Sequence, residues 1–161
     1  MKIKVGYGYD VHVLEKGEEL IIGGIKIAHY KGTIAHSDGD VLIHAICDAL
    51  LGAANLRDIG FQFPDNKQSL KGIDSKILLK KTQKLLQAKD YSISNIDTTI
   101  VMQEPKLKNK IPEMQQTLAS VLSIDIEDIS IKATTTEQLG FTGREEGVSA
   151  HAVALIIKGA L

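Results

Sequence analysis

Apolar and polar residues alternate near the start of the chain, and alternation with a period of two is typical of a β-strand. This pattern predicts a strand over residues 2–12. One side of that strand carries Ile3, Val5, Tyr7 and Tyr9. Apolar triplets then flank Gly23 and Gly24 within residues 20–27, and a Gly-Gly pair can supply the positive φ of a tight turn. The segment 20–27 is therefore expected to be a β-hairpin.

Later segments change to apolar residues spaced three and four apart, which is the pattern of an α-helix. It predicts helices over residues 40–54, 74–89 and 112–122, the last of them beginning at a proline. Ser37 or Asp38 is expected to cap the first helix. On the second helix lysines point outward, and the inward side is expected to comprise Ile77, Leu78, Leu85 and Leu86.

The remaining apolar runs predict strands, and the polar, glycine-containing stretches between elements predict loops. The strands are expected over residues 93–102, 129–135 and 148–157. The loops are expected over residues 55–72, 103–111 and 136–147. Strands and helices in this order favour an α+β fold, described as an α/β sandwich. It has one mixed β-sheet with helices packed on one face.

Composition narrows the class of protein. The chain has 161 residues, which is a one-domain length, so residues 1–161 are expected to form a single domain. A net charge of −1 gives no basic field for nucleic acid, so no nucleic-acid partner is expected. Cys47 is the only cysteine, which excludes an internal disulfide. The sequence holds no apolar stretch of membrane-spanning length and does not begin like a signal peptide, so a cytoplasmic protein without membrane contact is expected.

The first candidate for chemistry is a set of Asp and His residues. Asp10 and His12 are two apart on a predicted strand and so point to the same face. His44 lies on the first predicted helix, four residues after Asp40. Two imidazoles and one carboxylate, with a fourth position open, form the pattern of a catalytic zinc site. In that interpretation Asp40 orients an imidazole. Ordinary polar surface is the alternative interpretation.

The second candidate combines residues 132–137 with the glycine-flanked residues 140–144. Hydroxyl groups, backbone N–H groups near glycines and the guanidinium of Arg144 are the groups that bind phosphates. The carboxylate of Glu137 could hold a magnesium ion that also touches phosphate oxygens. A threonine-rich strand end followed by a surface turn is the alternative here.

Long motifs in both regions resemble those of the 2-C-methyl-D-erythritol 2,4-cyclodiphosphate synthase family of the non-mevalonate isoprenoid pathway. The resemblance runs along essentially the whole chain. It is carried by GYDVHVL, IIGGIKI, HSDGDVLIHAICDALLGAANLRDIGFQFPD, IPEMQQTLA and KATTTEQLGFTGREEG. It implies conversion of 4-diphosphocytidyl-2-C-methyl-D-erythritol 2-phosphate to the 2,4-cyclodiphosphate with release of CMP, by attack of the 2-phosphate on the β-phosphate. A zinc-dependent phosphohydrolase and a non-enzymatic, zinc-stabilised interaction domain are the alternatives.

The resemblance also implies roles for single residues. Asp10, His12 and His44 match the ligands of one Zn²⁺ per subunit, and Glu137 matches the ligand of Mg²⁺ or Mn²⁺. His36 and Thr135 match catalytic positions. Positions that match substrate contacts are Asp10, His12, His36, Ser37, Asp58, Gly60, Phe63, Pro64, Asp65, Met102, Pro105, Lys106, Leu107, Lys108, Thr134, Thr135, Thr136, Glu137, Phe141 and Arg144. Within this set, residues 102–108 match the cytosine pocket.

The resemblance implies an assembly as well. Members of the family are homotrimers whose active sites lie between subunits. An isoprenoid diphosphate can bind on the trimer axis, near the positions that match Arg144 and Glu146. Glu145 stands where a glycine is common in the family, and its added carboxylate weakens the expectation of an anion on the axis.

Overall fold

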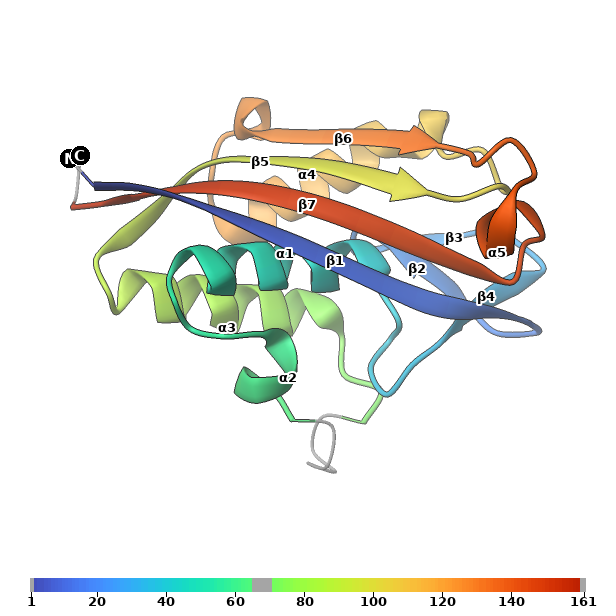
Figure 1. Cartoon of the computed structure of the whole chain (residues 1–161), viewed down its shortest axis with the longest axis horizontal. Helices are drawn as coiled ribbons and strands as arrows, with labels where there is room; N and C mark the ends of the chain where they lie inside the picture. The colour runs from blue at the N-terminus through green and yellow to red at the C-terminus, as the bar shows by residue number, and fades with distance from the viewer. Residues whose placement is uncertain (1, 65–70, 160–161) are drawn as a thin grey trace.

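A computed structural model describes residues 2–64 and 71–159 of the chain (Figure 1). The strands are β1 (Lys2–Lys16), β2 (Leu20–Ile22), β3 (Ile25–Ile27), β4 (Lys31–Ile34), β5 (Tyr91–Val101), β6 (Ile129–Thr134) and β7 (Gly147–Lys158). The α-helices are α1 (Val41–Ala53), α2 (Ile59–Gln62), α3 (Ser75–Gln87), α4 (Ile111–Leu122) and α5 (Gly140–Gly143). Two 3₁₀ turns are η2 (Lys108–Lys110) and η3 (Ile126–Asp128).

The large sheet is mixed, as the sequence predicts. Its strand order is β4-β1-β7-β5-β6, and β2 pairs with β3 in a separate hairpin. The pair β5–β6 is parallel, whereas β1–β4, β1–β7 and β5–β7 are antiparallel. In Figure 1 the strands β1 and β7 pass in front of α1 and α4, so the helices cover the far face of the sheet. The α+β class with helices on one face is confirmed.

The helix α1 lies in the core against β1. Its side chains are almost all buried, which is expected of a helix that is apolar on every side. Gly6 and Gly8 permit the close approach, because a Cβ at either position would come within 1.9 Å of a backbone oxygen of α1. This packing sets His44, in the first turn of α1, beside the end of β1 that carries Asp10 and His12.

Several local features differ from the prediction. The strand β4 and the one-turn helices α2 and α5 fall in segments without a periodic pattern, because four residues are too few to show one. The side chain of Ile77 is 47% exposed, and Leu79 takes the buried position instead. The cap of α1 is Asp40 rather than Ser37 or Asp38, since the Asp40 carboxylate accepts from the Ile43 backbone N–H at 3.0 Å.

The face of the sheet that carries no helix is apolar and exposed. Its exposed large side chains are Ile3, Val5, Tyr7, Tyr9, Val11, Val13, Ile34 and Val153. They come mainly from alternate positions of β1, whereas the intervening Gly6 and Gly8 face the core. A contiguous apolar patch of this kind marks a surface that contacts another protein or a membrane. Among the described residues, no helix is long and apolar enough to cross a membrane.

Candidate active site

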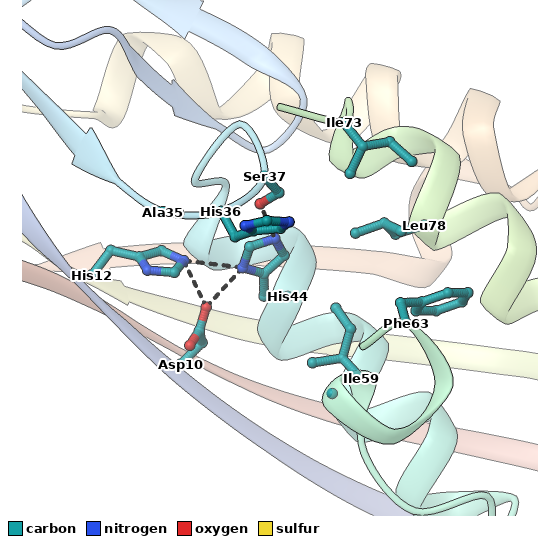
Figure 2. Close-up of a pocket in the computed structure, with 11 residues that line it drawn as sticks. Asp10, His12, Ala35, His36, Ser37, His44, Ile59, Phe63, Ile73 and Leu78 are labelled. Carbon is teal, nitrogen blue, oxygen red and sulfur yellow. Dashed lines mark hydrogen bonds and ion pairs between the residues drawn. The ribbon is translucent and has the colours of Figure 1, made fainter. Parts of the chain in front are cut away.

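Three side-chain atoms from two elements converge at one point (Figure 2). Asp10 Oδ2 lies 3.0 Å from His12 Nε2 and 3.0 Å from His44 Nδ1, and those two nitrogens are 3.0 Å apart. Ligand atoms around a tetrahedral Zn²⁺ are about 3.3 Å apart, given bond lengths of about 2.0–2.1 Å. The spacing and the donor types, two imidazoles and one carboxylate, therefore fit a single metal ion. The convergence predicted for Asp10, His12 and His44 is confirmed.

The charges of these three residues are coupled. Burial by itself would raise the pKa of Asp10, but hydrogen bonds and positive charge from His12 and His44 hold it well below its usual range. Burial by itself would lower the pKa of His44, and the hydrogen bond and charge of Asp10 raise it overall. Asp10 is therefore a carboxylate at neutral pH. A negative charge between two ring nitrogens attracts a cation.

The second nitrogen of the His44 ring makes separate contacts. His44 Nε2 lies 3.0 Å from Ser37 Oγ and 3.0 Å from Ser75 Oγ. Asp40 contacts neither ring, so its predicted role in orienting an imidazole is wrong. Its fully buried carboxylate instead accepts from the backbone N–H groups of Gly23 at 3.0 Å and Gly24 at 2.6 Å, besides that of Ile43. Asp40 thus joins the β2–β3 turn to the start of α1.

A cavity of ≈ 220 Å³ opens beside the three converging residues (Figure 2). It is lined by Asp10, His12, Ala35, His36, Ser37, His44, Ile59, Gly60, Phe63, Ile73 and Leu78. His36 Nε2 is buried there without a hydrogen-bond partner among the described residues, so it is available to a ligand. The predicted residues Asp58 and Pro64 are outside the lining, and Asp58 caps α2 through the Phe61 N–H at 2.8 Å. Asp65 lies outside the described residues.

A second cavity, of ≈ 390 Å³, lies at the ends of β5 and β6. It is lined by Met102, Pro105, Lys106, Leu107, Lys108, Ile111, Ala133, Thr134 and Thr135. The structure thus brings the predicted cytosine loop, residues 102–108, together with the first threonines of the phosphate segment. Ala133 belongs to the predicted segment 132–137, and Ile111 is an addition that the sequence did not indicate.

The remaining predicted residues follow β6 in an exposed turn. Thr135 Oγ1 lies 3.2 Å from Glu137 Oε1, and the backbone of Glu137 has a positive φ of 52°. Thr136 donates to the carbonyl of Leu139 at 2.6 Å. Thr136, Glu137, Phe141 and Arg144 are outside the lining of both cavities. Glu137, Phe141 and Arg144 are exposed in the isolated chain, and Thr136 is half-buried.

Arg144 makes a two-point ion pair with Glu146, with N–O distances of 3.0 and 3.1 Å. Glu145 points elsewhere: its carboxylate accepts from the Tyr30 hydroxyl at 3.0 Å, and its carbonyl accepts from Lys31 Nζ at 2.7 Å. Its φ of 56° explains why a glycine suits this position. The Glu145 carboxylate is thus held by Tyr30, directly before β4, rather than by Arg144.

The two cavities are separated within one chain. Asp10 is in register with Ala150 on β7, Ala150 with Ile100 on β5, and Ile100 with Ala133 on β6. Three steps between adjacent strands amount to about 14 Å, because neighbouring strands are about 4.8 Å apart. The converging residues and the β6 segment therefore lie on opposite sides of β7 and β5.

Sequence reasoning missed Ser75 as a neighbour of His44. Ser75 begins α3 and is fully buried, and it donates its hydroxyl to Asp38. A serine after the capping Asp74 looks like an ordinary helix start in sequence. Only the packing of α3 against α1 brings it to the ring of His44.

The chain is similar to known proteins along nearly its whole length. The model of the YgbB family matches residues 3–157. The curated 2-C-methyl-D-erythritol 2,4-cyclodiphosphate synthase of Bacteroides fragilis is 67% identical over 97% of this chain and 98% of its own length. Bifunctional IspDF from Campylobacter jejuni superposes with a TM-score of 0.93 at 41% identity, over 96% of this chain and 42% of that one. The CDP complex of IspF from Plasmodium falciparum superposes with a TM-score of 0.85 at 36% identity, over 98% of this chain and 97% of that one. The chain therefore belongs to the YgbB family, in agreement with the resemblance of its motifs to the cyclodiphosphate synthases.

Proposed function

We propose that the chain converts 4-diphosphocytidyl-2-C-methyl-D-erythritol 2-phosphate to 2-C-methyl-D-erythritol 2,4-cyclodiphosphate and releases CMP. It would act as a phosphorus-oxygen lyase in the non-mevalonate isoprenoid pathway. The observation that carries the proposal is the convergence of Asp10, His12 and His44 beside a cavity. That arrangement occurs in a chain 67% identical to a curated synthase.

The reaction needs no nucleophile from the protein, because the 2-phosphate of the substrate attacks its own β-phosphate. The chief barrier is the approach of two anionic phosphates, so the residues must donate hydrogen bonds and hold the substrate in a folded conformer. His36 Nε2 is buried in the first cavity without a partner among the described residues, which leaves it free for a phosphate oxygen. Ser37 offers a hydroxyl in the same cavity, and Thr135 offers one from the second.

We assign one Zn²⁺ per chain to Asp10, His12 and His44, whose donor set leaves a fourth position for substrate. When bound there, zinc supplies a Lewis acid that offsets the negative charge of the attacked phosphate. We assign Mg²⁺ or Mn²⁺ to Glu137, an exposed carboxylate beside Thr135. Among the described residues, Glu137 forms no ion pair with a Lys, Arg or His side chain that would compete with the metal. That ion supplies charge for the diphosphate.

The cytidine of the substrate is assigned to the second cavity. A cytosine ring offers a fixed array of one donor and its acceptors, which loop backbone can match. The loop 102–108 and the strand end at Thr134 and Thr135 enclose the volume that the ring needs. Thr136, Phe141 and Arg144 then lie toward the diphosphate.

We further propose that the active chain is a homotrimer with three sites between subunits. Within one chain about 14 Å separates the row of Asp10 from that of Ala133, so the two halves of a site come from neighbouring copies. The exposed apolar side chains of β1 supply a surface for that contact. A site between copies would close the open space beside Glu137.

An isoprenoid diphosphate on the trimer axis remains part of the proposal. Arg144 would bind it in exchange for its pair with Glu146, which is exposed and therefore weakly held. The hydrogen bond from Tyr30 keeps the Glu145 carboxylate away from that guanidinium. The Glu145 carboxylate would therefore repel a diphosphate on the axis less than the sequence alone indicates.

We also propose that residues 1–161 act as one domain and work in the cytoplasm. Most buried apolar side chains of the described residues, from Leu14 to Ile156, form one cluster. The cytoplasmic location stays a prediction from the sequence.

Incubation of the purified chain with the substrate, zinc and magnesium in ¹⁸O-labelled water tests the reaction. We expect CMP and the cyclic diphosphate in equal amounts by phosphorus NMR, without ¹⁸O in either product, because no water attacks. A His44→Ala variant is expected to give neither. An ¹⁸O-labelled linear product from the wild type would favour a phosphohydrolase and overturn the proposal.

A further inference from the structure

The ring of His44 uses its two nitrogens differently. Nδ1 faces Asp10 and His12, where a metal ion would take its lone pair. A neutral imidazole has one N–H, so the proton of a metal-bound His44 sits on Nε2. That single N–H has two acceptors at equal distance, because Ser37 Oγ and Ser75 Oγ both lie 3.0 Å from Nε2.

Ser75 and Ser37 differ in whether their hydroxyl proton has a fixed acceptor. The Ser75 hydroxyl donates to Asp38 Oδ1, and the Ser75 backbone N–H donates to Asp38 Oδ2 at 2.9 Å. The lone pairs of Ser75 Oγ are therefore left to face His44. Ser37 Oγ has no carboxylate partner among the described residues and accepts only a long bond, 3.3 Å, from the Gly39 N–H.

We propose that Ser75 and Asp38 are positioning residues for the metal ligand His44, linked in the order Asp38, Ser75 Oγ, His44 Nε2–H. The negative charge of Asp38 polarises the Ser75 hydroxyl, which makes its oxygen a better acceptor for the ring N–H. A stronger acceptor on one nitrogen fixes the tautomer and raises the basicity of the other nitrogen. The inference rests on the assignment of a metal to Asp10, His12 and His44.

The surroundings hold this chain of bonds in place. Ser75 is 0% exposed and begins α3, and His44 is 9% exposed in the first turn of α1. The backbone N–H of Asp38 donates to the carbonyl of Ile73 at 3.1 Å, which ties the segment before α1 to the segment before α3. The contact thus couples the packing of two helices to the orientation of one ring.

A consequence concerns Ser37. Since Ser75 accepts the ring proton, the Ser37 hydroxyl can turn its own proton into the cavity and donate to a phosphate oxygen. Ser37 then acts on substrate and Ser75 acts on the metal ligand, although both oxygens are equally close to His44.

Zinc affinity tests this division without any assay of turnover. Each metal-free variant is titrated with Zn²⁺ against a chromophoric chelator, and thermal unfolding of the metal-free form checks that it folds.

Ser75→Ala is expected to weaken zinc binding about 10- to 100-fold. Asp38→Asn keeps an acceptor for Ser75 but loses the charge, so its loss is expected to be smaller. The matched control Ser37→Ala is expected to stay within about threefold of the wild type. In the zinc-loaded protein, Ser75→Ala is also expected to shift the His44 Nε2–H resonance upfield.

The results distinguish a failure of the positioning role of Ser75 from a failure of the metal assignment itself. Zinc affinity of Ser75→Ala within about threefold of the wild type, or an equal loss in Ser37→Ala, overturns the positioning role. If Ser75→Ala fails to fold, wild-type zinc affinity in Asp38→Asn overturns it instead. His44→Ala tests the metal site itself: undiminished zinc binding in that variant would overturn the assignment of the metal, whatever Ser75 does.

Discussion

Gly8 of β1 lies directly against the carbonyl of Ala45 in α1, so that a Cβ at position 8 would come within 1.9 Å of that oxygen. Gly8 precedes Asp10 by two residues, and Ala45 follows His44. The depth to which α1 settles on β1 therefore sets the distance between the His44 ring and the Asp10 carboxylate, which is 3.0 Å. A backbone contact thus controls the geometry of the candidate metal site.

Gly8→Ala tests that control. The added methyl group must push α1 away from β1, which is expected to cost about 1–3 kcal/mol in the free energy of unfolding. It should also weaken zinc binding, because His44 moves with the helix.

The matched control is Gly52→Ala in the same helix, where a Cβ meets nothing within 4 Å. This control is expected to stabilise by about 0.5–1 kcal/mol with unchanged zinc affinity. Denaturant unfolding and zinc titration give both values, and a stable Gly8→Ala with full zinc affinity would contradict the account.

Asp40 predicts a pH dependence of stability. Burial raises the pKa of this carboxyl from 3.8 to about 6, although three backbone N–H groups favour its ionised form. Between those values the folded state binds more protons than the unfolded state, so stability falls as the pH rises through the interval. The fall amounts to at most about 3 kcal/mol, at 1.36 kcal/mol for each pKa unit.

Asp40→Asn removes this titration. The free energy of unfolding of the wild type minus that of the variant is expected to decrease from about pH 4 to about pH 7. Urea unfolding of both metal-free proteins at several pH values measures the difference. A difference that grows with pH would mean that the backbone donors outweigh burial and keep Asp40 ionised.

The second cavity predicts a selective effect on nucleotide binding. Ala133→Leu extends a side chain into the space between β6 and the loop 102–108, so CMP affinity is expected to fall about 10-fold or more through steric exclusion. Zinc affinity should not change, because β7 and β5 lie between β1 and the strand β6 that carries Ala133. Ala88→Leu, at the exposed end of α3, is the control. Calorimetry with CMP decides, and undiminished CMP binding by Ala133→Leu would place the base elsewhere.

The open face of the sheet predicts an assembly. Val5 is 65% exposed on β1, and Val5→Glu puts a charge into any contact made by that face. Sedimentation is expected to show a loss of trimers in favour of single chains. Ile77→Glu on α3, where the side chain is 47% exposed, should leave the mass unchanged. Trimers of full stability in Val5→Glu would exclude this face as the interface.

The sequence predicts the long elements because their apolar periodicity extends over ten or more residues. The alternation of β1 and the helical spacing of α1 are examples. It does not predict β4, whose four residues become a strand only by pairing with residues 13–16. It also misplaces the cap of α1, since three residues with suitable side chains precede the helix. Asp40 is selected by the backbone N–H groups of the β2–β3 turn, a tertiary contact.

In the candidate site, too, contacts within one element can be predicted from the sequence, whereas contacts between elements depend on packing. Asp10 and His12 share a strand face, so their convergence follows from local geometry. The approach of His44 requires α1 to pack on β1; residue type and spacing indicated this set only as one of two interpretations, and the motif resemblance implied the same three residues. Ser75 could not be foreseen, because its role depends on where α3 starts relative to the ring of His44.

The central claim is that the site joins Asp10, His12 and His44 of one copy to Thr135 and Glu137 of another. Coexpression of His44→Ala with Glu137→Ala measures this directly, because each variant alone lacks one half of every site. In a cyclic trimer every mixed assembly has one interface with two intact halves, so random mixing restores about a quarter of the wild-type activity. The pair His44→Ala with His12→Ala damages the same half twice and is expected to restore none. We predict CMP release at about a third of the wild-type rate from purified mixed trimers of the first pair, since one of the three sites in each is intact. No activity in those trimers would contradict the account and place each complete site within one chain.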